Sequence, residues 1–128
     1  MWQSSEMVGT TPLVVVFFAS WCELSARKVP IIARAVQKTG HQITLWVAVD
    51  DEATKPDIAG FLREQRLGNQ PFIVGDHYPE FVAAYNPIRS IPLVVVIGKS
   101  GHLVDYQVGL NDDDGPRLEE ALQAARLR

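Results

Sequence analysis

Cys22 is the only cysteine in the 128-residue chain, and its neighbours along the sequence suit a nucleophile. Three residues separate it from an apolar run at residues 13–18, whose β-branched and aromatic composition is typical of a strand buried on both faces. Residues 22–38 then have the apolar spacing of an amphipathic helix. A thiol at a helix start meets unpaired backbone N–H groups and the positive end of the helix dipole, which favour the nucleophilic thiolate. We therefore expect chemistry at Cys22 rather than the buried apolar role that is the alternative for a lone cysteine.

A family resemblance rests on the same stretch. Residues 17–22 read FFASWC, and Ser25 and Pro30 follow at the spacing that thioredoxin-fold active sites use for their second cysteine and a proline. The segment most closely resembles the TlpA-like branch of periplasmic thiol–disulfide oxidoreductases, and the likeness extends over the chain from Thr11 onward. The resemblance implies that Cys22 is the catalytic nucleophile.

The second position of the motif departs from the family pattern, because Ser25 stands where the family has its resolving cysteine. In a dithiol site the second thiol releases the substrate from the first, so a mixed disulfide on Cys22 would persist here until an outside thiol resolved it. Ser25 is either natural in a monothiol protein or a cysteine changed to serine to trap a substrate, and the sequence leaves both open. Lys28 stands where many TlpA-like proteins have a glutamate, which agrees with a site that no longer uses a resolving thiol.

Pro92 follows Ile91 just before an apolar run, where the family has a cis-proline beside its active cysteine. The resemblance implies that the Ile91–Pro92 bond is cis, and that the Ile91 backbone can pair with an extended substrate as an added strand would. We expect Trp21 to contact the substrate as well. The alternative is a trans-proline that merely opens a strand.

The elements that position these residues follow from the alternation of apolar runs with helical patterns. We expect strands at residues 12–18, 43–49, 72–74, 93–97 and 102–108, and helices at residues 22–38, 54–67 and 79–85 with a last one near Pro116. The apolar face of the first helix is expected to consist of Val29, Ile32, Ala33 and Val36. Thr54 is expected to cap the second helix.

These elements predict an α/β thioredoxin fold with a mixed central sheet and flanking helices. The strand at 43–49 is expected beside the strand at 12–18, followed by the terminal hairpin, and the resemblance implies a TlpA-like helix–strand insertion after the second strand. We expect the strand at 72–74 to extend the sheet edge beside the second strand. Residues 1–10 are expected to form a flexible lead-in, and residues 11–128 a single domain.

Composition excludes several classes of function. The net charge of −3 gives no reason to expect nucleic acid as a partner, and no apolar run approaches the ~20 residues that span a bilayer. We expect no cofactor and no metal, because His41, His77 and His102 lack metal-ligand spacing. The acidic runs at residues 50–52 and 112–114 are interpreted as solvated strand ends and helix caps.

Two functions remain at this point. The first is a thiol–disulfide oxidoreductase that acts on protein thiols or disulfides through Cys22, with a redox partner protein or small thiol as second partner. The second is a redox-inactive thioredoxin-fold module that binds a protein or peptide beside Pro92. By resemblance we expect a periplasmic protein, or one anchored to the membrane and facing the periplasm, whose leader is not in this chain; a cytoplasmic location is the alternative.

Overall fold

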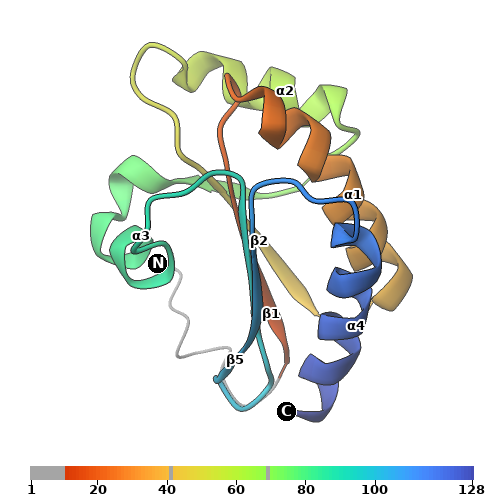
Figure 1. The fold of residues 1–128 in the computed structure, drawn as a ribbon. Coiled ribbons are helices and arrows are strands. Elements are labelled where there is room, and N and C mark those ends of the chain that lie inside the picture. Colours follow the sequence, from red (N-terminus) through yellow and green to blue (C-terminus); the bar gives the residue numbers. More distant parts are fainter. Residues whose placement is uncertain (1–10, 41, 69) are drawn as a thin grey trace.

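The computed structural model describes residues 11–40, 42–68 and 70–128, which form one five-stranded mixed sheet in the order β3-β2-β1-β4-β5 (Figure 1). The strands are β1 (Leu13–Phe18), β2 (Ile43–Ala48), β3 (Phe72–Val74), β4 (Leu93–Ile97) and β5 (Leu103–Val108). The helices are α1 (Glu23–Thr39), α2 (Ile58–Glu64), α3 (Pro79–Tyr85) and α4 (Asp114–Leu127), with short 3-10 helices η2 (Lys55–Asp57) and η3 (Gly75–His77). The lead-in expected at residues 1–10 lies outside the described residues.

Strand β1 is the centre of the sheet, and all six of its side chains are buried. It pairs in parallel with β2 and antiparallel with β4, where Phe17 lies opposite Leu93. The predicted strand order is confirmed, including the position of β3 at the edge beside β2.

The alternating side chains of β1 divide the core between two faces of the sheet. Val14, Val16 and Phe18 belong to the cluster that α1, α2 and α4 cover, whereas Val15 and Phe17 belong to the cluster under α3. Figure 1 shows α1 and α4 together on one side of the sheet and α3 on the other. The predicted flanking of the sheet by helices is therefore confirmed.

Two local predictions about helices are wrong. The helix expected over residues 54–67 begins as the 3-10 helix η2, which contains Pro56, and its α-helical part ends at Glu64. Thr54 does not cap it with its side chain; instead the Thr54 N–H donates to Asp51 Oδ1 at 3.0 Å. Thr54 is therefore held by the preceding turn through Asp51.

The buried face of α1 also differs from the apolar stripe expected from the sequence. Ala33 and Val36 are only partly buried. The buried residues of this helix are Ser25, Lys28, Val29, Ile32 and Ala35. Two polar residues therefore take core positions, which a pattern based on hydrophobicity assigns to solvent.

Candidate active site

Cys22 occupies the N-cap of α1 with an extended backbone (φ −93°, ψ 116°), and its carbonyl accepts the first helical hydrogen bond from Ala26 N–H at 3.1 Å. Its thiol is partly exposed and makes no capping hydrogen bond. The N–H groups of the first helical turn lack partners within the helix, and the helix dipole is positive at this end. Cys22 thus lies at the N-terminal end of α1, in a position that is partly open to solvent.

Ser25 lies one turn further along α1, and its side chain is fully buried. Its hydroxyl oxygen accepts a hydrogen bond from the Ala19 N–H at 3.3 Å. The Cys22 N–H in turn donates to the Ala19 carbonyl at 3.2 Å. Ser25 therefore fixes the loop that delivers Cys22, and its hydroxyl has no chemistry by which it could form a disulfide.

Asp50 is a residue of this site that the sequence analysis did not single out. It follows β2 and is 5% exposed, and its carboxylate accepts hydrogen bonds from the Ser20 hydroxyl and from the Ser20 N–H, the latter at 3.1 Å. The interpretation of Asp50 as a solvated strand end is therefore wrong. The carboxyl ends of the parallel strands β1 and β2 lie side by side at one end of the sheet. The predicted pairing of these strands could therefore have indicated that Asp50 lies close to the loop at Ser20.

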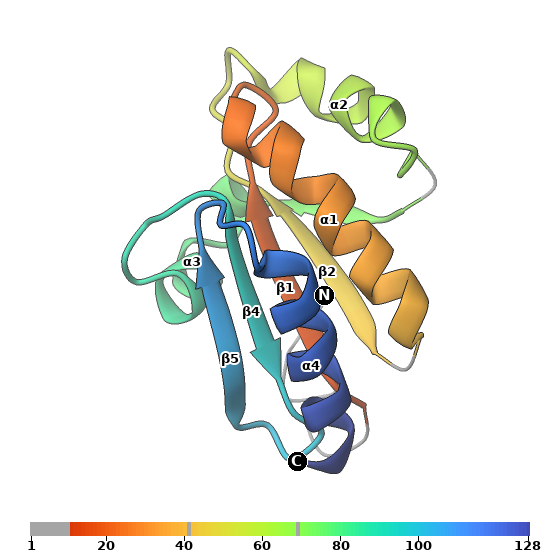
Figure 2. The same cartoon turned by 45° about the vertical axis from the view of Figure 1, so that its right-hand side comes forward.

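The peptide bond between Ile91 and Pro92 is cis, as the resemblance implied. Because Leu93 pairs with Phe17, this bond lies at the end of the sheet where the chain leaves β1 toward Cys22. Figure 2 shows that the loop after β1 and the loop before β4 lie at this same end. The Pro92 carbonyl accepts from the Gly109 N–H at 2.9 Å. No described residue hydrogen-bonds to the backbone of the half-buried Ile91.

The loop before Pro92 is held by Asn86, a second residue that the sequence analysis did not single out. Asn86 is 1% exposed; its side-chain amide donates to the Ser90 carbonyl at 2.8 Å, and its Oδ1 accepts from the Ser90 N–H at 3.0 Å. An Asn-Pro pair favours a turn, which was the local signal for this residue. Asn86 and Asp50 thus fix the two loops that meet at the site.

A buried polar network joins α1 to the start of α4. Lys28 and Asp114 are both fully buried and form an ion pair, and Lys28 Nζ also donates to Gln107 Oε1 at 2.9 Å. The Asn111 N–H donates to Asp114 Oδ2 at 2.7 Å. Asp114 is therefore not a solvated helix cap as predicted; it joins α4 to the helix that carries Cys22.

The pKa values of Lys28 and Asp114 are shifted by burial and by the interaction between the two side chains. Burial lowers the pKa of the Lys28 ammonium below its ordinary value of 10.5, and the Asp114 carboxylate offsets part of that effect. Burial by itself raises the pKa of Asp114, but hydrogen bonds from Lys28 and from the Asn111 N–H outweigh it and hold this pKa below 3.8. Asp114 is thus ionised at neutral pH.

Trp21 is the remaining predicted site residue, and its side chain is 59% exposed directly beside Cys22. Leu24 and Ile88 are exposed apolar side chains near the two loops of the site.

Within the described ranges, no group of three His, Cys, Asp or Glu side chains could hold a metal ion. In the same part of the chain, no helix is both long enough and apolar enough to cross a membrane.

Neither a family model nor a curated protein matches the sequence. Solved structures do match over nearly the whole chain. DsbF of Mycobacterium tuberculosis, in mixed oxidised and reduced forms, is 18% identical with a TM-score of 0.78, covering 97% of this chain and 87% of that one. The fold is the thioredoxin fold. The predicted fold class is confirmed.

Two further thioredoxin-fold structures show the same breadth of similarity. A putative thiol:disulfide interchange protein DsbE from Chlorobium tepidum is 20% identical with a TM-score of 0.77, covering 95% of this chain and 84% of that one. A secreted disulfide oxidoreductase from M. tuberculosis, homologous to E. coli DsbE, is 16% identical with a TM-score of 0.75, covering 96% and 87%. At these identities the similarity establishes the thioredoxin fold of the chain.

Proposed function

We propose that this thioredoxin-fold chain exchanges thiols and disulfides with protein substrates, with Cys22 as the nucleophile. One observation carries the proposal: the partly exposed Cys22 stands at the N-terminus of a 17-residue helix, at the end of the sheet where the cis Ile91–Pro92 bond also lies. The thiol-disulfide functions named for the DsbE-like neighbours support the same chemistry.

The reaction begins when the Cys22 thiolate attacks one sulfur of a substrate disulfide. A bond forms between Cys22 and that sulfur, the substrate S–S bond breaks, and the other substrate sulfur leaves as a thiolate that takes a proton from water. Since Ser25 cannot attack the mixed disulfide, release requires an external thiol, which displaces Cys22 and is itself left bonded to the substrate. The chain as it stands is therefore a monothiol exchanger that holds its substrate.

Substrate docking is assigned to the surface around the same sulfur. The Ile91 backbone, free of partners among the described residues, offers one N–H and one C=O to an extended segment. Trp21 and Leu24 supply exposed apolar surface next to Cys22. These features favour an extended peptide with a cysteine or disulfide over a small disulfide.

We place the protein outside the cytoplasm. The support is the description of one thioredoxin-fold neighbour as secreted and of another, from Streptococcus pneumoniae, as an exposed lipoprotein. Disulfides persist in oxidising compartments of this kind, so substrates with disulfides would be present there.

The test is capture of a peptide that carries a disulfide-activated cysteine, followed by intact mass of the full chain. We expect one peptide per chain, linked through Cys22, and none on the Cys22→Ser variant. Without any added thiol the adduct should persist. A wild-type chain that forms no adduct, yet binds the reduced peptide as tightly as Cys22→Ser does, would overturn the exchange function in favour of the redox-inactive binding module.

A further inference from the structure

A cleft of about 470 Å³ lies away from Cys22, where α1 and β2 meet the segment that follows α2. Its volume is within the range of small-molecule sites. Pro30 is the lining residue nearest to Cys22 in sequence, and it lies about 12 Å further along α1 at ~1.5 Å per residue. The cleft is therefore separate from the thiol and its peptide-docking surface.

The charged side chains that line this cleft are all positive. Arg34 lines it from α1 and Arg66 from the turn after α2, and no described carboxylate is among the lining residues. Neither arginine forms an ion pair with a described residue. In a chain of net charge −3, two unpaired guanidinium groups on one cleft favour an anionic ligand.

Two buried polar atoms without partners belong to side chains that line the same cleft. Trp46 is 2% exposed, and its indole N–H has no acceptor; the Thr44 hydroxyl two residues earlier on β2 also has no partner among the described residues. An unpaired buried donor is costly unless a partner arrives. Both atoms are buried, so a ligand would reach them only if a neighbouring side chain shifted.

The rest of the lining is apolar or neutral. Ala33, Val36 and Leu67 give an apolar wall, and glutamines such as Gln37 and Gln65 offer amide groups. We propose that this cleft binds a small amphipathic organic anion, with its ring or short acyl body on the apolar wall and its carboxylate or sulfonate between Arg34 and Arg66. The Trp46 N–H supplies a further donor to such a head group.

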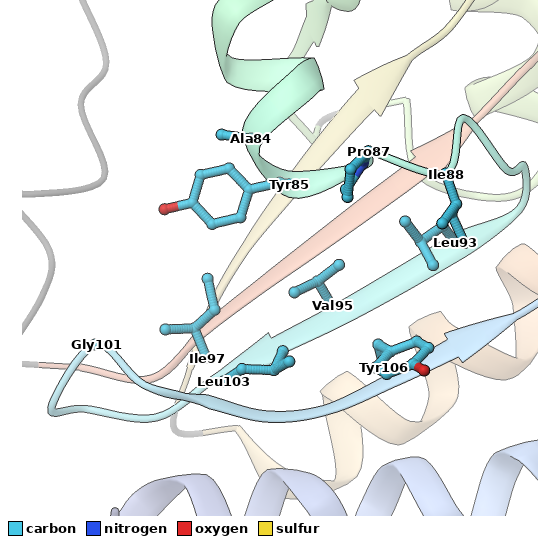
Figure 3. A pocket seen from close by; sticks show the side chains of 10 residues that line it. All are labelled: Ala84, Tyr85, Pro87, Ile88, Leu93, Val95, Ile97, Gly101, Leu103 and Tyr106. Atoms are coloured by element: carbon cyan, nitrogen blue, oxygen red, sulfur yellow. The ribbon is translucent and has the colours of Figure 1, made fainter.

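An uncharged groove elsewhere in the molecule provides a control for binding that depends on apolar surface alone. It has a volume of about 460 Å³ and lies along β4 between α3 and β5, and none of its lining residues is charged (Figure 3). Figure 3 shows Val95 on its floor, Tyr85 on one side and Tyr106 on the other. An apolar probe without charge should enter this groove as readily as the arginine-lined cleft.

The probe is 8-anilinonaphthalene-1-sulfonate, compared with N-phenyl-1-naphthylamine, which has the same rings and no sulfonate. Both are titrated by fluorescence against the full chain at low salt. The double change Arg34→Gln and Arg66→Gln should weaken binding of the sulfonate by about tenfold or more and leave the uncharged probe within about twofold. Trp46→Phe, which keeps a ring and removes the N–H, should also weaken the sulfonate.

The matched control changes two exposed arginines elsewhere, Arg27→Gln and Arg126→Gln, and should leave both probes unaffected. Urea unfolding of each variant establishes that it is folded. The proposal is overturned if the sulfonate does not bind, if the two double variants bind it equally, or if Leu103→Ser with Tyr106→Ser abolishes its binding, which would place it in the groove of Figure 3.

Discussion

The two faces of the sheet differ in how completely helices cover them. Where α1 and α4 pack on it this face is closed, and its core accommodates even the buried Lys28–Asp114 ion pair. The arginine-lined cleft lies further along the same face, between α1 and the segment after α2. On the other face α3 leaves a groove open along β4 and β5, where Leu103 and Tyr106 are 59% and 54% exposed (Figure 3). The helices α1 and α4 thus fix the position of Cys22 on one face, whereas we expect the more open face to contribute less to stability, and it leaves apolar surface available.

The largest effect is expected for the ion pair of the closed face. Lys28→Ala leaves the Asp114 carboxylate buried without its cation, and should lower the free energy of unfolding by about 3–5 kcal/mol in urea titrations at neutral pH. The matched control is Lys28→Met with Asp114→Leu, which removes both charges and should recover most of that loss. Equal losses in the single and double variants would show that the ion pair does not join α1 to α4 energetically.

Val94 and Val95 test the contrast directly, because they are neighbours on β4 and belong to opposite faces. Val94→Ala opens a cavity in a closed core and should cost about 2–3 kcal/mol of unfolding free energy. Val95 borders the open groove, where water can fill the space, so Val95→Ala should cost about 1 kcal/mol. If the two changes cost the same in urea unfolding, the two faces are packed equally well.

A smaller effect is expected when the pH is lowered. Since the folded-state pKa of Asp114 is below 3.8, its contribution to stability is complete above that pH and is lost as the pH falls through the folded-state value. When the pH is lowered from 5 to below 3.8, the unfolding free energy of the wild-type chain should therefore fall by more than that of the variant with Lys28→Met and Asp114→Leu. Parallel pH profiles of the two proteins would contradict this assignment of charge.

The sequence was sufficient for features that depend on neighbouring residues. The apolar run of β1, the hairpin of β4 and β5, and the place of Pro92 were all predicted from local patterns and from the resemblance. Long-range polar partners were not predictable in this way. Lys28 finds its acceptor on Gln107, 79 residues away, and the apolar face expected for α1 did not include this lysine.

The same limit applies to the loops of the candidate site. Asp50 was interpreted as solvated because it opens an acidic run, yet its carboxylate holds Ser20 from 30 residues away. Asn86 closes the loop before Pro92 through its own side chain. Each is a short polar residue whose role depends on which loop the fold brings beside it.

In the proposed function, Cys22 is an exchange nucleophile whose substrate is retained because Ser25 cannot displace it. The direct measurement is release of a peptide disulfide-linked to Cys22, followed by intact mass without added thiol, in the wild-type chain and in Ser25→Cys. Positions three apart on a helix share one face, so the new thiol should displace the peptide on the order of a hundredfold faster than in the wild type and leave an internal disulfide. Equal release rates in the two proteins would contradict this role of Ser25.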